Sequence, residues 1–327
     1  MKAVTSLPSA DWTVLAARAR LLRAVRDFFD GLGFLEVETP ILSADTVVDR
    51  HLDPLSTELQ GVGPARTLYL QTSPEFAMKR LLAAGGPSIY QTAHAFRQGE
   101  RGSRHNPEFT LVEWYDVGAD YDRGRQLLSD LAHRLLGRGP AERLTYGEAM
   151  LRYAGMDPHA ATLEQLRDAA VRNAPEAAAA FTSASAPVDR DAWLDLLLMT
   201  CVEPKLGFAR PTILCDYPAS QAALARVRPG PPAVAERYEL YVDGIELANG
   251  YHELLDAETL AARNAENNRL RRADGKPTLP EESRLLEAMR RGLPKCAGCA
   301  LGFDRVVMLA CGKSTIDDVM PFPIERA

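Results

Sequence analysis

Two arginines that are far apart in the sequence have the chemistry to bind a nucleoside triphosphate. Arg97 lies in Phe96-Arg97-Gln98-Gly99-Glu100, and Arg305 follows Ala300-Leu301-Gly302-Phe303-Asp304. Guanidinium groups bind phosphate oxygens bidentately. A strand arginine, a short polar loop and then Phe109, four residues after His105, can hold an α-phosphate, a bent triphosphate and an adenine face. Arg305 opens a helix after a glycine turn and can meet the γ-phosphate, so the pattern predicts an ATP site.

A second group of candidate residues flanks a predicted hairpin. The dipeptide Asp243-Gly244, which favours a two-residue turn, separates the runs 238–242 and 245–249. Acids on either side of such a turn can face the same way, and two carboxylates bridged by triphosphate oxygens suit Mg²⁺. Glu239 and Glu246 can instead be solvated hairpin glutamates, but beside the two arginine motifs we interpret them as metal ligands.

Further acids are expected near the same strands. Alternation along a strand places Glu113 and Tyr115 on one face, and it does the same for Asn249, Tyr251 and Glu253. A polar pocket lined by carboxylates is therefore geometrically plausible. Such a pocket would select a cationic substrate.

The elements that must position these side chains can be predicted from periodicity. Apolar residues at spacings of three and four predict an amphipathic helix over residues 12–32, and alternation predicts a strand over 34–39 that ends at Pro40. Residues 67–71 form another predicted strand. Ser73-Pro74-Glu75 then begins a helix, predicted to bury Phe76, Leu81 and Leu82.

The region between the two arginine motifs is less informative. Thr162-Leu163-Glu164-Gln165 is a capping box, residues 183–187 are a predicted turn, and a helix follows that carries Trp193, Leu194 and Leu197. The charged run 269–280 is predicted to be an exposed or mobile loop. These segments indicate packing only.

Composition narrows the function classes. The formal charge of −6 disfavours a protein whose main task is to bind a polyanion, although it allows a local basic patch. Five cysteines without a disulfide-framework spacing suit a reducing compartment, and we interpret Cys296-Ala297-Gly298-Cys299 as buried thiols. Since no apolar run approaches about 20 residues and the N-terminus lacks a signal-peptide core, we expect a cytoplasmic protein without membrane contact.

The segments 34–40, 96–109 and 300–305 resemble, in this order, motifs 1, 2 and 3 of the class II aminoacyl-tRNA synthetases. The resemblance implies an α+β fold with an antiparallel sheet flanked by helices, and a homodimer formed through residues 11–40. It also implies that Arg97 and Arg305 are catalytic, that Phe109 stacks on adenine and that His105 and Asn106 position the nucleotide. The remaining ATP-site residues implied by it are Gln98, Gly99, Glu100, Glu246, Leu247 and Gly302.

One position departs from the motif. Most class II enzymes place an acid two residues after the first arginine, where it accepts from the adenine amino group, whereas this chain has Gly99 there and Glu100 one position later. Either the backbone bulges and brings Glu100 inward, or a main-chain carbonyl near Gly99 reads the base.

Several segments are similar to the lysine-specific branch of this family. In that branch Ser73-Pro74-Glu75 would hold the amino group of the amino acid, and the glutamates and tyrosines of segments 211–218 and 236–240 would bind its side-chain ammonium. We therefore expect Ser73, Pro74, Glu75, Glu113, Tyr115, Asn249, Glu253 and Ala300 to bind the substrate.

The resemblance narrows further because motif 1 begins only about thirty residues from the start, without room for the anticodon-binding OB domain of lysyl-tRNA synthetases. The chain is most similar to stand-alone paralogues that activate (R)-β-lysine and ligate it to a lysine of elongation factor P. We thus expect one catalytic domain over 1–327 with a helical insertion at 140–205, and no tRNA partner. Ala300 replaces the glycine of lysyl-tRNA synthetases, and one methyl group can shift substrate discrimination by roughly 1–3 kcal/mol.

The implied reaction has two steps. The β-lysine carboxylate attacks the α-phosphate of Mg-ATP, and a lysine ε-amine of the partner protein then attacks the adenylate carbonyl. Two alternatives stay open: a ligase for (S)-lysine with another acceptor, and a regulatory paralogue that binds ATP or an amino acid without turnover. The second would usually have lost a motif arginine, yet Arg97 and Arg305 are both present.

Overall fold

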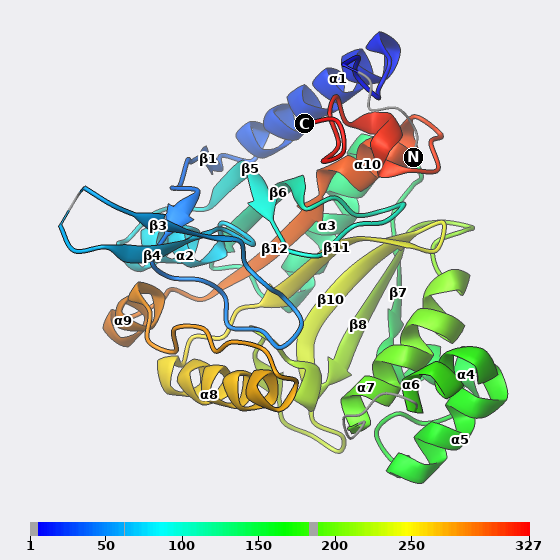
Figure 1. The fold of residues 1–327 in the computed structure, drawn as a ribbon. Coiled ribbons are helices and arrows are strands. Elements are labelled where there is room, and N and C mark those ends of the chain that lie inside the picture. The colour runs from blue at the N-terminus through cyan, green and yellow to red at the C-terminus, as the bar shows by residue number, and fades with distance from the viewer. Residues whose placement is uncertain (1–5, 62, 183–188) are drawn as a thin grey trace. The chain divides into compact units, whose positions relative to one another are not determined.

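The computed structural model describes residues 6–61, 63–182 and 189–327, so the turn predicted at 183–187 lies outside the described residues. The chain forms two compact units (Figure 1). Unit 1 comprises Met1–Ala119, Arg134–Leu136 and Leu255–Ala327, and unit 2 comprises Asp120–His133 and Gly137–Leu254. Both combine β-sheet with helices, as the predicted α+β class requires.

Unit 1 contains four neighbouring strands in the order β1 (Leu35–Glu36), β5 (Ile89–Phe96), β6 (Glu108–Val117) and β12 (Cys296–Gly302). β1 is parallel to β5, whereas β5, β6 and β12 are antiparallel. A second sheet has the order β2 (Leu42–Ser43), β4 (Arg66–Leu70), β3 (Ser56–Leu59). The helices are α1 (Trp12–Gly31), α2 (Glu75–Ala83), α8 (Ala257–Ala273), α9 (Arg284–Arg291), α10 (Phe303–Ala310) and the 3₁₀-helix η4 (Ile316–Val319).

Unit 2 contains strands in the order β11 (Ile245–His252), β10 (Val234–Val242), β8 (Thr212–Pro218) and β7 (Glu142–Thr145), with β9 (Val227–Arg228) paired to β10. The β7–β8 pair is parallel and the others are antiparallel. Its helices are α3 (Tyr121–Leu136, ending in unit 1), α4 (Tyr146–Ala154), α5 (Leu163–Asn173), α6 (Pro175–Thr182), α7 (Arg190–Leu197), the π-helix η1 (Leu198–Val202) and the 3₁₀-helices η2 (Glu203–Lys205) and η3 (Ala219–Gln221). Segment 140–205 thus contains four of these α-helices.

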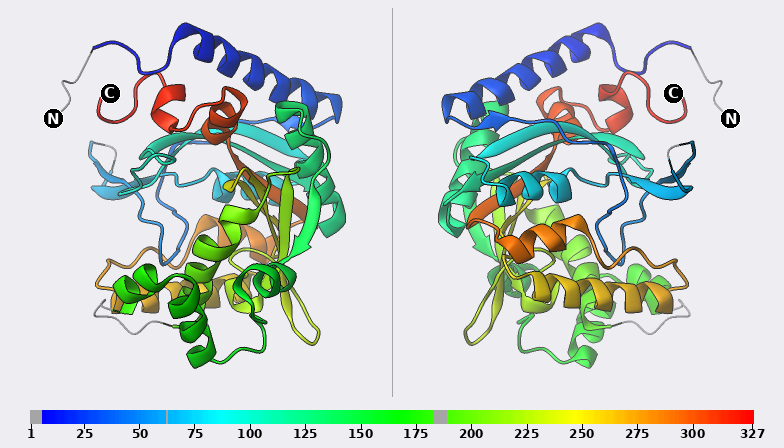
Figure 2. Two further views of the ribbon diagram at one scale, coloured as in Figure 1. Left: turned by 90° about the vertical axis from the view of Figure 1, so that its right-hand side faces the viewer. Right: turned by 90° about the vertical axis from the view of Figure 1, so that its left-hand side faces the viewer.

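Helix α1 covers the apolar core of unit 1. Asp11 caps it by accepting a hydrogen bond from the Val14 amide, which satisfies one of the free donors of the first turn. Phe29 is fully buried, stacks on Tyr90 at 4.7 Å between ring centroids and lies 5.3 Å from Trp114. Figure 2 shows the C-terminal segment beside the start of α1, where the Ser9 amide donates to the Pro321 carbonyl.

Most predicted elements are confirmed, with shifts at their ends. α1 matches the predicted helix, the Thr162 capping box is present, and Asp243-Gly244 forms the hairpin turn with both residues at positive φ. The strand predicted over 34–39 is shorter, because only Leu35–Glu36 pairs with β5.

The burial of the predicted core and surface residues agrees with the structure only in part. Leu81 was predicted to be buried but is 40% exposed, because it follows Arg80 on the outer side of α2. The thiols of Cys296 and Cys299 are buried on β12, as predicted. The exposed loop predicted at 269–280 is wrong for Arg271, since α8 continues to Ala273 and Arg271 is buried.

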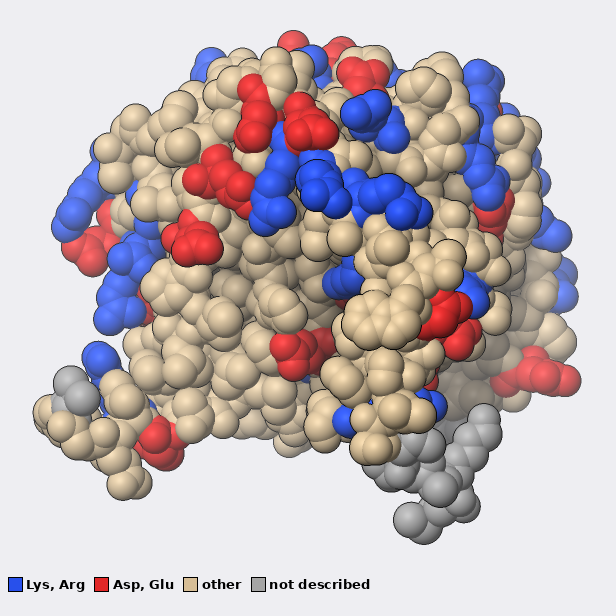
Figure 3. All heavy atoms as spheres, turned by 90° about the horizontal axis from the view of Figure 1, so that it is seen from above, with Lys and Arg blue, Asp and Glu red and all other residues tan. Residues whose placement is uncertain are grey.

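The surface carries mixed charge. Figure 3 shows acidic and basic side chains interspersed on one face, so the net charge of −6 does not make this face uniformly acidic. None of the helices in the described part of the chain is long and apolar enough to cross a membrane.

Candidate active site

Arg305 is positioned by its neighbour Asp304, at the start of α10. The Asp304 carboxylate is 2% exposed and accepts hydrogen bonds from Arg18 Nη1 of α1 at 2.5 Å and from the Thr110 amide of β6 at 2.7 Å. Arg18 Nη2 also donates to Thr110 Oγ1 at 2.8 Å. These bonds fix the first turn of α10 against a helix and a strand, so the direction in which Arg305 leaves the helix is set by the core of unit 1.

The Arg305 side chain reaches the loop that follows β5. Its Nε donates to the Arg104 carbonyl at 3.3 Å, and its Nη2 lies 2.6 Å from His105 Nε2. Because a guanidinium group can only donate, His105 Nε2 accepts here and the ring is neutral. Loss of hydration and then the Arg305 charge lower the pKa of His105, which is consistent with a neutral ring.

Arg97 lies directly after β5 and approaches the same loop from its other end. Its amide donates to the Pro107 carbonyl at 2.9 Å, and its guanidinium carbon lies 5.0 Å from the ring centroid of Phe109. Arg97 Nη1 is 3.6 Å from Glu100 Oε1. Gly99 has a φ of +80°, a conformation that favours glycine, and the turn that it makes brings Glu100 toward Arg97. The Glu100 carboxylate therefore faces the Arg97 guanidinium.

We call residues 97–109, which are expected to bind the nucleotide, the nucleotide loop; its last two residues begin β6. The structure brings Arg97, Glu100, His105, Phe109 and Arg305 together around it, all within unit 1. Both arginines that sequence reasoning paired lie close enough to His105 for their charges, after burial, to lower its pKa, Arg305 more than Arg97. Gln98 and Gly99 belong to the same loop, and Gly302 is the residue that immediately precedes α10.

The nucleotide loop is held from outside by the C-terminal segment. Asn106 is 2% exposed, and its side chain donates to the Glu108 carbonyl and accepts from the Ile324 amide at 3.0 Å. The Ile316 amide donates to the Ser103 carbonyl at 2.7 Å. Arg101 donates to the carboxylates of Asp317 and Glu325 at 2.6–3.0 Å. Sequence reasoning missed this clamp, because no local pattern links residues more than two hundred positions apart.

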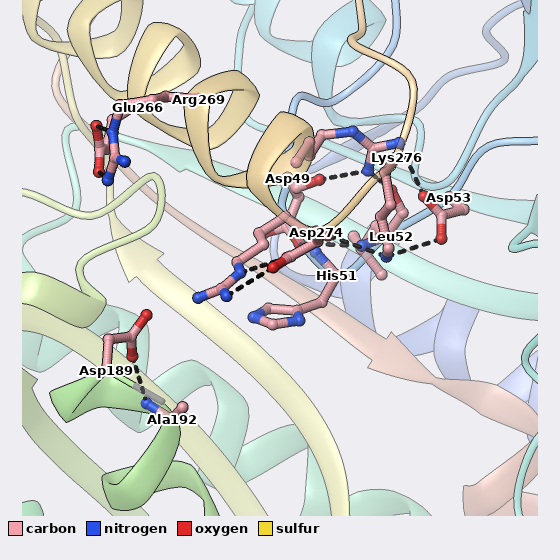
Figure 4. A network of polar contacts seen from close by, with 12 residues as sticks. Asp49, His51, Leu52, Asp53, Asp189, Ala192, Glu266, Arg269, Asp274 and Lys276 are labelled. Atoms are coloured by element: carbon pink, nitrogen blue, oxygen red, sulfur yellow. Dashed lines mark hydrogen bonds and ion pairs between the residues drawn. The ribbon is translucent and has the colours of Figure 1, made fainter. Parts of the chain in front are cut away.

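A second support of the loop comes from segment 49–53. The Gln98 amide donates to the Asp53 carbonyl at 2.8 Å. The Asp53 carboxylate accepts from Arg271 Nη2 at 2.8 Å and from Lys276 Nζ at 2.9 Å, and Figure 4 shows Lys276 beside Asp53. Although burial opposes the shift, the hydrogen bonds from Lys276 and Arg271 lower the pKa of Asp53. Asp53 therefore joins the end of α8 to the start of the nucleotide loop.

A buried cluster of polar side chains lies at the start of α2 and on β6. We call Ser73, Glu75, Lys79, Glu113 and Tyr115 the acid cluster. Glu113 is 2% exposed, and its carboxylate accepts from Tyr115 Oη and from Ser73 Oγ, each at 2.6 Å. Burial, and then the neighbouring charge of Glu75, raise the pKa of Glu113 to about 7.

The remaining predicted substrate residues of unit 1 surround this cluster. Pro74 is the N-cap residue of α2 and makes no side-chain cap, whereas Ser73 Oγ accepts from the Glu75 amide at 3.0 Å. Ala300 of β12 is the register partner of Glu113. Lys79, which sequence reasoning missed, is 1% exposed and donates to Glu75 Oε1 at 2.5 Å. The signal for it was the i, i+4 spacing after Glu75.

Unit 2 contains the other predicted residues on β10 and β11. In the antiparallel register Glu239 pairs with Asn249, and Tyr241 pairs with Glu246 across a bulge. Asn249 accepts from Arg237 Nε at 3.3 Å and donates to Tyr251 Oη at 3.1 Å. Glu253, which directly follows β11, is 1% exposed. Leu247 is also buried on β11.

The glycine between these residues is needed for packing. A Cβ on Gly250 would lie 2.5 Å from the Tyr238 ring, so only glycine lets this ring cross the strand.

The carboxylates of unit 2 fit a divalent cation only in part. Glu239 accepts from Arg237 Nη2 and Tyr217 Oη, each at 2.5 Å, and from Tyr241 Oη at 2.6 Å. A cation would have to replace one of these donors, whereas Glu246 is half-buried on the same face. In the part of the chain that the structure describes, no group of three or more His, Cys, Asp or Glu side chains could hold a metal ion. Any Mg²⁺ would therefore need ligands from the nucleotide.

The arrangement of two converging arginines, a clamped loop and buried acids agrees with comparisons to known proteins. The family model of class II tRNA synthetases (D, K and N) matches residues 9–326. The chain belongs to this class II synthetase family, as its α+β fold and the place of its motifs in unit 1 require.

Individual members of the family match this chain over nearly their entire length. Proteins from Yersinia enterocolitica, Salmonella typhi and Vibrio cholerae, each named elongation factor P (R)-β-lysine ligase, are 45% identical to this chain. Each match covers 98% of this chain and 98% of the relative. The similarity is therefore not confined to the ATP-binding motifs.

Proposed function

We propose that this protein is an AMP-forming ligase that activates (R)-β-lysine with ATP and attaches it to a lysine side chain of elongation factor P. The observation that carries the proposal is the convergence of Arg97 and Arg305 on one loop, in a chain 45% identical to ligases of that name. The acid cluster supports a cationic substrate, because its buried carboxylates would be neutralised by an ammonium group.

The first step is attack of the β-lysine carboxylate on the α-phosphate, which forms an adenylate and releases pyrophosphate. Arg97 stabilises charge on the nonbridging oxygens, and Arg305 holds the γ-phosphate end that leaves. Phe109 offers an aromatic face for adenine beside Arg97, and base stacking contributes about 1–3 kcal/mol. In the second step, the ε-amine of the partner lysine attacks the adenylate carbonyl, AMP leaves, and an amide forms.

Magnesium remains part of the proposal. Bound to the triphosphate, Mg²⁺ would neutralise charge on its oxygens, and Glu246 with Glu239 would hold it. The hydrogen bonds from Arg237, Tyr217 and Tyr241 orient the Glu239 carboxylate.

We also propose that the protein acts as a cytoplasmic homodimer, with residues 1–327 as one catalytic domain, segment 140–205 as an insertion and no tRNA as acceptor. Trp12, Leu32 and Leu35 are 81%, 46% and 53% exposed, so the segment proposed as the dimer interface presents apolar side chains. All five cysteines are free thiols, which suits a reducing compartment.

The proposal is tested by the intact mass of elongation factor P after incubation with this protein, ATP and an amino acid. We expect the mass to increase by one β-lysyl group with (R)-β-lysine, and much less with (S)-lysine. Omission of ATP is the control. An unmodified acceptor, despite pyrophosphate exchange with (R)-β-lysine, would refute the acceptor and leave the adenylate step intact.

The alternative of a regulatory paralogue finds no support in the site. Both motif arginines are present, and they reach the same loop. Preferred exchange with (S)-lysine would instead favour a lysine-activating enzyme.

A further inference from the structure

Lys79 is a buried cation that the proposed mechanism does not use. It lies on α2, is 1% exposed and is among the largest fully buried side chains of the described chain. Burying an ammonium group is costly unless it is paired. Its Nζ donates to Glu75 Oε1 at 2.5 Å and lies 5.7 Å from the ring centroid of Tyr115. The site of this lysine therefore holds a positive charge beside the residues proposed to bind the amino acid.

The acids around Lys79 are close enough to affect one another. Ser73 Oγ connects them, since it accepts from the Glu75 amide at 3.0 Å and donates to Glu113 Oε2 at 2.6 Å. Both acids are largely buried, at 8% and 2% exposure. Two carboxylates in such surroundings tend to share a proton unless a cation lies near them.

We infer that Lys79 is a positioning residue for the substrate: paired with Glu75, its charge favours the ionised form of Glu113, so that both carboxylates can bind the ammonium groups of a diamino acid. This inference rests on the proposed function. Burial and the charge of Glu75 raise the pKa of Glu113, whereas hydrogen bonds from Ser73 and Tyr115 and then the charge of Lys79 lower it. Without Lys79, a cationic substrate would more often have to displace a proton from Glu113 before it could bind.

Titratable groups on two elements lie near Lys79. Glu75 is on α2 itself, and Glu113 and Tyr115 are on β6. Helix α9 also packs on α2, but it contributes the buried side chains of Leu285, Leu286 and Met289. Its charged residues, Arg284, Glu287, Arg290 and Arg291, are exposed.

The test compares Lys79→Met with Arg80→Met in β-lysine-dependent pyrophosphate exchange between pH 5.5 and 9, a range that brackets the pKa of Glu113. We call the rise of kcat/KM for β-lysine with pH the acid limb. We expect Lys79→Met to move the acid limb up by about one pH unit and to raise KM at pH 7 about fivefold, with kcat little changed. Arg80 is the next residue on the exposed side of α2, so Arg80→Met should leave the limb in place.

A substrate-free measurement keeps the inference testable if exchange is absent. Buried acids without a counter-ion have raised pKa values, so they stabilise the fold when protonated, and this stability is lost as the pH rises through those values. The Tm of Lys79→Met should therefore fall more steeply between pH 5.5 and 8 than the Tm of the unmodified protein. The double variant Lys79→Met/Glu75→Gln, which removes both charges, should restore the shallow slope.

The outcomes separate the two claims. Absence of β-lysine-dependent exchange in the unmodified protein would sink the proposed function, whatever the Tm slopes show. A folded Lys79→Met protein with an unshifted acid limb and an unchanged Tm slope would show that Lys79 only fills space. An equal shift in Arg80→Met would likewise overturn the inference, because the effect would then come from the general charge of α2.

Discussion

The nucleotide loop and the acid cluster, both in unit 1, hold their charges in opposite ways. Around the loop, the Arg97 and Glu100 side chains are 27% and 29% exposed and are 3.6 Å apart, and Arg305 bonds a carbonyl and a neutral ring. In the cluster, Lys79 and Glu113 are 1% and 2% exposed and make bonds of 2.5 and 2.6 Å. The charged side chains around the loop are thus partly exposed, whereas those of the acid cluster are buried.

This difference assigns different tasks to the two regions. Exposed ion pairs contribute only about 0–1 kcal/mol, so Arg97 can exchange Glu100 for a phosphate at little cost. Buried carboxylates lose most of their hydration, and a ligand without matching cations leaves them uncompensated. The loop therefore suits the binding of a triphosphate group, whereas the acid cluster discriminates among amino acids.

Replacement of Arg305 should have the largest effect and is the strongest test of the difference between the loop and the acid cluster. We expect Arg305→Ala to lower the kcat of pyrophosphate exchange by at least about 100-fold, because loss of one preorganised donor to a transition-state charge has an effect of this size. The fold should persist, since Asp304 rather than Arg305 ties α10 to α1 and β6. Exchange of labelled pyrophosphate into ATP measures the effect.

Arg291→Ala is the matched control for Arg305→Ala. Arg291 is exposed and pairs with Glu287 on the same helix, α9, so its loss removes an equal charge away from the loop. A rate for Arg305→Ala within about threefold of this control would remove Arg305 from the catalytic machinery.

The acid cluster gives the next largest effect. We expect Glu113→Gln to raise the KM for β-lysine by about 10- to 100-fold with a smaller change in kcat, since a hydrogen bond to a charged group contributes about 1.5–3 kcal/mol. The pKa of Glu113 is about 7, so the unmodified protein should bind the cation less well as the pH falls below 7. Glu113→Gln should lose this part of the pH dependence.

The sign of the stability change in Glu113→Gln provides a second check. Burial raises the pKa of Glu113 above its unfolded value, so its contribution to stability is present at low pH and is lost as the pH rises toward 7. Denaturant unfolding of Glu113→Gln should therefore show a flatter loss of stability between pH 5 and 7. Glu287→Gln, at an exposed site, is the control, and an equal slope in both variants would contradict the raised pKa.

The residues of the nucleotide loop could be predicted because their chemistry is local. Arg97, His105 and Phe109 lie within one short segment, and the glycine turn before Arg305 is visible in the sequence. The hairpin at Asp243-Gly244 was equally clear, since its two positive φ values demand such residues.

The supports of the site could not be predicted, because they depend on contacts between distant segments. Arg271 was assigned to a loop from the charges around it, yet its guanidinium is buried against Asp53 and the carbonyls of Asp49 and Leu52. Lys79 carries no sequence sign of its burial beyond the spacing to Glu75. A charged residue is normally exposed, and only the tertiary structure shows where a partner group allows it to be buried.

The smallest expected effect concerns Arg101, whose guanidinium group donates to the Gly102 and His105 carbonyls of the loop and also to acids of the C-terminal segment. Its hydrogen bonds to Glu325 lower the pKa of that carboxyl, but both side chains are substantially exposed, so the pairs add little stability. Arg101→Ala should raise the KM for ATP about two- to fivefold without changing kcat, and high salt should reduce the difference. Arg290→Ala, which also loses pairs with two exposed acids, Glu258 and Glu282, is the control. A loss of kcat as large as that of Arg305→Ala would mean that the C-terminal clamp shapes the site itself. The division between a partly exposed loop and a buried cluster would then fail.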